Sequence, residues 1–209
     1  KFRKRDFAFF IIAGFSLLNV KTVYSIVFLG MLAVPYKVFG GRKQKWKDYV
    51  IMIGIVLALS ILRKIPYMGL PIDENQYVGI QKAFIFSHPI YYIKVLYMNI
   101  TNQFQNQMYW MIGTLGYLDT YIPKVYEFFI GVYLVIVFLI DAFTEKIKLP
   151  LWLKIGYALC VIFVVCGMYT VMYTSWTPAI TGVTGGDFIT GVQGRYYLPL
   201  LFLIPVIFN

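Results

Sequence analysis

Long apolar runs constrain this chain more than any other feature of its sequence. Four of them approach or exceed the roughly 18 to 20 residues that a helix needs to cross the hydrocarbon core of a bilayer. The chain of 209 residues is 60% hydrophobic and only 13% charged, which is far from the composition of soluble domains. Within lipid an apolar run must be helical, because only a helix satisfies its own backbone polar groups. The sequence therefore predicts an all-α transmembrane fold, a polytopic helical bundle.

Basic residues gather in short stretches beside these runs, and their placement decides how the net charge of +10 is interpreted. A basic chain can bind nucleic acid, but short basic loops beside spanning segments mark the cytoplasmic side of a membrane protein. Three such stretches hold Lys1, Arg3, Lys4 and Arg5; Lys37, Arg42, Lys43, Lys45 and Lys47; and Lys146, Lys148 and Lys154. The pattern argues against a nucleic-acid partner and predicts a multi-pass protein of the cytoplasmic membrane, with the lipid bilayer as its first partner.

The same charges predict a topology for one transmembrane domain over residues 1–209. In chain order it has a short helical hairpin (6–35), a span (48–65), an outer segment (66–122), spans 124–143 and 151–173, an outer loop (174–195) and a partial span (196–209). Residues 66–122 and 174–195 are thus extracytoplasmic. Because the last run is about half of a spanning helix, we expect a fragment of a longer chain.

The outer segment contains a second kind of helical pattern. Ser87 is the expected N-cap of a helix with Pro89 in its first turn. Apolar residues then recur at a helical period, at Ile90, Ile93, Tyr97, Ile100 and Phe104. This pattern predicts an amphipathic helix lying on the outer leaflet.

Four stretches of the sequence resemble a known family. They are "VKTVYSIVFLGMLAVPYKVFGGRKQKWKDYV", "FIFSHPIYYIKVL", "GTLGYLDTYIP" and "GVQGRYYLPLL". In this order they resemble bacterial multi-spanning membrane proteins catalogued as a domain of unknown function, whose most specific part is a GxQGRYxxP signature. Members of that family are often associated with the assembly of cell-surface polysaccharides, which implies a bacterial inner or plasma membrane for this chain.

The architecture of that family is similar to the GT-C class of glycosyltransferases, which use polyprenyl-phosphate-linked sugars at the outer membrane face. The resemblance thus implies a polyprenyl-phosphate lipid and a surface polysaccharide or glycolipid acceptor as partners. In GT-C enzymes the usual catalytic carboxylate lies in an early outer loop, which here would precede Lys1.

Arg195 is the strongest candidate for a binding residue. It lies at the outer start of the last apolar run, beside Gln193 and Tyr196, and a guanidinium binds phosphate through two parallel hydrogen bonds. We expect this group to bind a lipid phosphate, with Gly191 and Gly194 allowing close approach of the backbone. The alternative is an interfacial arginine that pairs with ordinary lipid headgroups or with Asp187.

Lys21 is the second lipid-phosphate candidate. It lies at the tip of a hairpin whose helices are too short to protrude, so its charge needs a partner near the interface. A lipid phosphate would serve, and snorkelling to ordinary headgroups is the alternative.

Carboxylates and aromatic residues of the outer segments give weaker candidates. Asp73, Glu74 and Asp119 are loop carboxylates that can act as a base or hold a divalent metal against a leaving phosphate, or be solvated loop and turn residues. Trp176 and Tyr173 are suited to stacking on a sugar or to an interfacial aromatic belt. The single histidine, His88, gives no multi-histidine metal site and is expected at a helix start.

Two classes of function follow, and the alternatives stay open at this point. One is a glycosyltransferase in which Arg195 and Lys21 bind the donor phosphate. The other is a transporter or flippase component for a lipid-linked or anionic polymer, and a non-catalytic scaffold is a third possibility. Because the spans carry ionisable residues only near their ends, as at Glu127 and Asp141, the sequence favours chemistry at the outer surface over transport.

Overall fold

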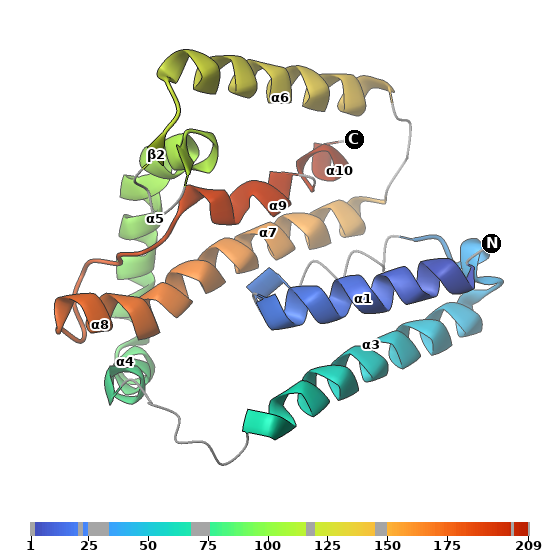
Figure 1. Cartoon of the computed structure of the whole chain (residues 1–209), viewed down its shortest axis with the longest axis horizontal. Helices are drawn as coiled ribbons and strands as arrows, with labels where there is room; N and C mark the ends of the chain where they lie inside the picture. Colours follow the sequence, from blue (N-terminus) through green and yellow to red (C-terminus); the bar gives the residue numbers. More distant parts are fainter. Residues whose placement is uncertain are drawn as a thin grey trace. The chain divides into compact units, whose positions relative to one another are not determined.

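The chain is almost entirely helical where its structure is described (Figure 1). This computed structural model describes residues 3–20, 23–24, 34–67, 76–115, 120–144, 150–201 and 203–208. By its contacts the chain divides into two compact units, Lys1–Ile72 and Asp73–Asn209. The all-α fold is confirmed, whereas the single domain with its six predicted membrane segments stays a prediction.

The first unit is built on two long helices, α1 (Lys4–Val20) and α3 (Arg42–Lys64), joined in part by the short α2 (Tyr36–Phe39). Near their ends, Asn19 donates a hydrogen bond to the Ser60 hydroxyl (3.0 Å) and accepts one from Arg63 (3.0 Å). Because the carboxyl end of α1 thus meets the carboxyl end of α3, the two helices are parallel. The second half of the predicted hairpin lies largely outside the described residues.

A small apolar cluster lies at the other end of this helix pair. Phe39, Tyr49 and Met52 are buried there, with Phe7 and Phe10 of α1 packed against them. Two glycines, Gly40 and Gly41, have positive φ values between α2 and α3. Helix α3 ends at Lys64 and gives way to a 3₁₀ turn, Ile65–Tyr67, which contains Pro66.

The second unit begins with α4 (Gln76–Ser87) and α5 (Pro89–Ile112). Ser87 does not cap α5, because its hydroxyl donates back to the carbonyls of Ala83 and Phe84 within α4. The residue at the cap position is His88, followed by Pro89. The prediction of Ser87 as N-cap was therefore wrong by one residue, while the predicted places of His88 and Pro89 at the helix start are confirmed.

Two residue pairs interrupt the helical fold after α5. Strands β1 (Thr114–Leu115) and β2 (Thr120–Tyr121) pair antiparallel, and α6 (Lys124–Thr144) follows. The expectation of helix alone misses this short ladder. It lies between helices, in the segment where glycines predict turns, so it breaks no spanning run.

The last part of the second unit is one long helix with an internal change of winding. Helix α7 (Leu151–Val171) continues through a π-helical segment, Met172–Trp176, into α8 (Thr177–Thr181). The expected end near Tyr173 is therefore passed by eight residues. Pro178 explains the change of winding. Its nitrogen has no hydrogen to donate to the Thr174 carbonyl, and its ring would clash with that carbonyl in an α-helix. The wider π-helical turn removes this conflict.

The chain ends in short helical pieces. A 3₁₀ turn (Gly194–Tyr197), α9 (Leu198–Leu201) and α10 (Ile204–Phe208) take the place of the continuous partial span expected over 196–209. Within the second unit, Figure 1 shows α5 running crosswise to α6 and α7.

Candidate functional site

Three amide side chains on one face of α5 hold the loop that precedes Arg195. We call Asn99, Gln103 and Gln107 the amide ladder, and residues 182–193 the glycine-rich loop. Asn99 donates to the Asp187 carbonyl (2.7 Å) and accepts from the Ile189 amide (2.9 Å). Because successive members are four positions apart, the three amides lie one above the other along the helix.

The other two rungs continue along the same loop. Gln103 donates to the Ile189 carbonyl (2.8 Å) and Gln107 to the Val192 carbonyl (3.1 Å). Asn99 and Gln107 are buried, and a buried backbone group without a partner costs roughly 1–3 kcal/mol. The ladder therefore fixes the loop backbone against α5.

Side chains from the neighbouring helices bind the remaining part of the loop. Three of these contacts are the Gln81 carbonyl oxygen with the Gly185 amide (2.9 Å), the Tyr173 hydroxyl with the Gly186 carbonyl (2.9 Å), and the Thr177 hydroxyl with the Thr190 amide (3.1 Å). They come from α4, the π-helical segment and α8. A loop held from several sides is a preorganised support for the residue that follows it.

Two glycines of the predicted signature are explained by contacts inside the protein. A Cβ on Gly194 would lie 2.5 Å from the Met111 nitrogen and 2.8 Å from the Trp110 carbonyl carbon. A Cβ on Gly191, where φ is +87°, would overlap the Trp176 ring, 2.6 Å from its Nε1. The expectation that these glycines admit a ligand to the backbone is corrected, because helix α5 and Trp176 occupy that space.

Arg195 follows directly and is half-buried in the 3₁₀ turn Gly194–Tyr197. The turn packs on the end of α5, since Gly194 lies against residues 107–111. The α-helix that follows directly, α9, has only four residues. A long helix whose first turn could bind an anion is therefore absent directly after Arg195 in the described residues, and phosphate binding by Arg195 stays a prediction.

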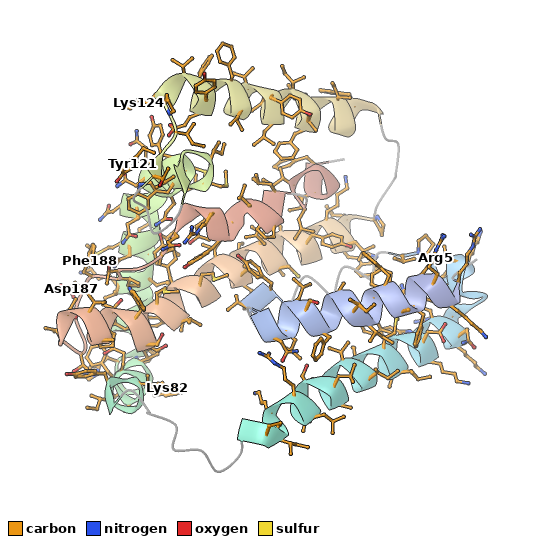
Figure 2. The ribbon with its side chains drawn as sticks, in the orientation of Figure 1. Arg5, Lys82, Tyr121, Lys124, Asp187 and Phe188 are labelled. Atoms are coloured by element: carbon orange, nitrogen blue, oxygen red, sulfur yellow. The ribbon has the colours of Figure 1, made fainter. Side chains whose placement is uncertain are left out.

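Asp187, the alternative partner for Arg195, is directed elsewhere. Its carboxylate accepts a hydrogen bond from Tyr91 in the first turn of α5, and its backbone carbonyl accepts one from Asn99. Gly194 lies at Gln107, eight residues or about 12 Å further along the helix axis. Figure 2 likewise shows Asp187 and Phe188 away from Tyr121 and Lys124, which mark the far end of α5. The structure does not bring Arg195 and Asp187 together.

A second tyrosine at the start of α5 faces the long helix. The Tyr92 ring lies 5.3 Å from that of Tyr173, centroid to centroid, and its hydroxyl is 2.6 Å from the Thr170 hydroxyl. Burial raises the pKa of Tyr92, so this phenol is neutral at ordinary pH. Tyr92 thus packs between α5 and α7 and links the two helices through its hydrogen bond with Thr170.

Two buried amide oxygens lie at the junction of the loop and the 3₁₀ turn. They belong to Gln107 and Gln193, and neither has a hydrogen-bond partner within the described ranges. The amide of Gln107 already binds Val192, the neighbour of Gln193. The Gln193 oxygen is thus turned into the protein rather than toward a ligand. The two unpaired acceptors make the junction beside Arg195 unfavourable in free energy.

The two aromatic candidates have different environments. Tyr173 is fully buried, and its hydroxyl binds Gly186, so no face of its ring is open to a sugar; its expected stacking role is corrected to one of support. Trp176 is 51% exposed and covers Gly191. Trp176 alone keeps an open ring surface.

Four candidates fall outside the described residues. They are Lys21, Asp73, Glu74 and Asp119, and their roles stay predictions. Within the ranges that the structure does describe, no group of three His, Cys, Asp or Glu side chains is placed to hold a metal ion.

The amide ladder is the functional feature that sequence reasoning missed. Its signal is present in "NITNQFQNQ", where Asn99, Gln103 and Gln107 recur every four residues. The prediction for this helix is based instead on its apolar stripe, which indicates an amphipathic helix on the outer leaflet. In the structure that stripe is exposed, with Ile93 and Tyr97 more than half accessible, while the polar ladder faces inward.

On α5, buried amides and an exposed apolar stripe depart from the usual arrangement of a helix in a soluble domain. The helix Leu151–Thr181 has 31 residues and is long and apolar enough to cross a bilayer, by length and composition, and only 28% of its most apolar stretch is buried. It is the one such helix among the residues described. These features are typical of a helical membrane protein.

The chain belongs to the family described as "Predicted membrane protein (DUF2142)", whose model matches residues 1–204. The expected membership of a membrane family of unknown function is thereby confirmed. No curated protein and no solved structure matches the chain. The GT-C similarity and the specificity of the GxQGRYxxP signature stay predictions.

Proposed function

We propose that this chain is part of a GT-C-like glycosyltransferase that uses a polyprenyl-phosphate-linked sugar at the outer membrane face. In this account Arg195 binds the phosphate of the donor lipid. The acceptor is a surface polysaccharide or glycolipid.

The observation that carries the proposal is the support built around Arg195. The amide ladder fixes the loop before it, and Gly194 fixes the turn that contains it. A guanidinium on a rigid backbone loses less freedom on binding than one on a mobile loop. Such a residue is suited to a planar, two-point contact with phosphate.

Trp176 supplies the proposed surface for the sugar. Its ring covers Gly191, four residues before Arg195, and remains half exposed. Amphipathic aromatic rings of this kind suit the apolar face of a carbohydrate. Tyr196 stays a candidate hydrogen-bonding partner of the phosphate, and Lys21 a second cation.

The transport alternative has less support in the long helix. From Leu151 to Thr181 its one Asp, Glu, Lys or Arg is Lys154, in the first turn. Transporters usually carry ionisable residues at mid-membrane depth. The proposal therefore places the chemistry at the membrane surface.

Replacement of Arg195 tests this account directly. We expect Arg195→Ala to weaken binding of undecaprenyl phosphate to the purified, detergent-solubilised chain by about tenfold to a hundredfold, the usual range for a lost charged hydrogen bond. Arg195→Lys should not restore it, because an ammonium lacks the planar fork. Release of polyprenyl phosphate from a polyprenyl-phosphate sugar, measured on the full-length protein, should fall in parallel.

Lys94→Ala is the matched control, since Lys94 is an exposed cation on α5 far from the loop junction. It should leave binding unchanged. Equal binding by wild type and Arg195→Ala would refute the phosphate site, and binding without any sugar release in the full-length wild type would refute the transferase.

A further inference from the structure

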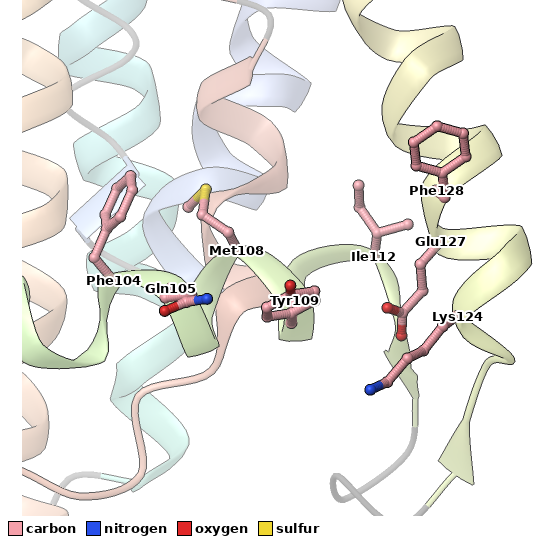
Figure 3. Close-up of a pocket in the computed structure, with 8 residues that line it drawn as sticks. All are labelled: Phe104, Gln105, Met108, Tyr109, Ile112, Lys124, Glu127 and Phe128. Atoms are coloured by element: carbon pink, nitrogen blue, oxygen red, sulfur yellow. The ribbon is translucent and has the colours of Figure 1, made fainter.

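A groove between α5 and the start of α6 lies apart from the loop that carries Arg195. Its volume is about 530 Å³, within the roughly 300–1,000 Å³ of most small-molecule sites. Figure 3 shows the side chains that line it. On α5 these residues recur every four positions, so they form two adjacent stripes rather than a scattered surface.

One edge of the groove is apolar and the other is polar. Phe104, Met108 and Ile112 of α5 and Phe128 of α6 form the apolar edge, and Gln105, Tyr109, Lys124 and Glu127 form the polar edge. In Figure 3 the two sets point to opposite sides of α5 and of the first turns of α6. A site with this division fits an amphiphile, with its head on one edge and its chain on the other.

The charges on the polar edge have opposite signs. Lys124 and Glu127 form no ion pair with each other or with any other residue in the ranges that the structure describes. The Glu127 carboxylate lies over Gly113, where a Cβ would overlap it. The groove therefore presents one cation and one anion, held close together on the first turns of a single helix.

We propose that this groove binds one phospholipid whose headgroup carries both a phosphate and an ammonium group, as in phosphatidylethanolamine. Lys124 binds the phosphate, Glu127 binds the ammonium, and one acyl chain follows the apolar edge. A lipid that is only anionic, including a polyprenyl phosphate, is disfavoured because its charge meets the Glu127 carboxylate without a compensating ammonium. The proposal does not depend on Arg195.

The position of the groove fits a lipid rather than a soluble ligand. Its polar edge lies at the beginning of α6, where the sequence predicts the outer interface, and Phe128 lies one turn further into that helix. The exposed apolar stripe of α5 leads into the apolar edge through Phe104. A lipid taken from the surrounding leaflet would thus enter with its chain already in an apolar environment.

Binding of short-chain lipids to the purified full chain tests the proposal. By native mass spectrometry in detergent, we expect wild type to bind dioctanoyl phosphatidylethanolamine about fivefold more tightly than dioctanoyl phosphatidylglycerol, roughly the effect of one charge at a lipid surface. Glu127→Gln should abolish this preference by weakening the first lipid and strengthening the second. Lys124→Gln should weaken both lipids to a similar extent.

Lys94→Gln, an equally exposed lysine of α5, is the control and should change neither affinity. Phe128→Ala should weaken both lipids while keeping the preference, because it shortens only the apolar edge. Equal affinity of wild type for the two lipids would overturn the proposal, as would a preference that survives Glu127→Gln. Loss of undecaprenyl phosphate binding in Arg195→Ala with these preferences intact would separate the two sites.

Discussion

Gly194 explains the position of Arg195 better than any property of the arginine itself. Because Gly194 has no side chain, its backbone lies directly on the backbone of α5 at Gln107, Trp110 and Met111. The atoms that a larger residue would meet are backbone atoms, which have no rotamer through which to move away. Gly194 thus fixes the position of the turn along α5 and the direction in which the turn carries Arg195.

Gly194→Ala should therefore destabilise the protein, by about 2–3 kcal/mol on the scale of overpacked cores. We expect a lower thermal unfolding midpoint in detergent and weaker lipid-phosphate binding. Gly186→Ala is the matched control in the same loop, because its added Cβ would meet only Val183 at an ordinary 3.8 Å. Equal midpoints for the two variants would contradict the close packing of Gly194.

For single residues, the sequence predicts which ones are important better than it predicts which groups they contact. Arg195 does follow a glycine-rich loop, as the sequence indicates. The buried state of Tyr173 and the inward turn of Gln193 could not be predicted, because they depend on where α5 crosses the loop. That crossing joins residues some 90 positions apart, and no local pattern encodes it.

Helix α5 is the element on which the candidate site depends. Its inner face carries the amide ladder, and its outer face carries exposed apolar residues such as Ile93 and Tyr97. Each amide of the ladder donates to a loop carbonyl, and Asn99 also accepts from the Ile189 amide. These bonds explain how a segment rich in glycine can hold one conformation.

Loss of the ladder contacts made by Asn99 should release the loop. In Asn99→Ala the Ile189 amide and the Asp187 carbonyl lose their partners, so we expect a loss of about 2–3 kcal/mol and faster hydrogen exchange over residues 182–193. Asn106→Ala removes an exposed asparagine of the same helix and should have little effect. Unchanged exchange in the loop of Asn99→Ala would show that the ladder does not hold it.

Helices are predicted from this sequence more reliably than their ends. The apolar runs indicate α6 and α7 to within a few residues, because hydrophobicity and helix length are both local properties. The continuation of α7 to Thr181 was missed, since a proline after "YTSW" normally predicts a helix end. Hydroxyls of Thr174 and Ser175 bind carbonyls one turn back, and this local support lets the helix pass through the π-helical segment.

The surface of the whole molecule is consistent with a bilayer environment. Apolar side chains remain exposed along α6 and α7, including Phe129, Tyr133 and Phe163. Such a surface in water would be an aggregation liability, whereas in lipid it is the expected one. The family match and this surface agree on a membrane protein, and the number of spans and their orientation stay predictions from the charges.

Orientation is the claim on which the phosphate-binding account depends most. If residues 182–193 face the outside of the cell, Arg195 lies at the depth of the outer lipid phosphates. If they face the cytoplasm, a donor lipid presented at the outer face cannot reach it. The positive-inside rule predicts the first arrangement, because the lysine-rich stretch near Lys43 is then cytoplasmic.

Labelling with a membrane-impermeant maleimide in intact cells tests this orientation. In a chain freed of Cys160 and Cys166, a cysteine is introduced either by Val183→Cys, at an exposed position of the loop, or by Lys43→Cys in the basic stretch. The account predicts that Val183→Cys is labelled in intact cells and Lys43→Cys only after permeabilisation. Labelling of Lys43→Cys in intact cells, with Val183→Cys protected until permeabilisation, would contradict it.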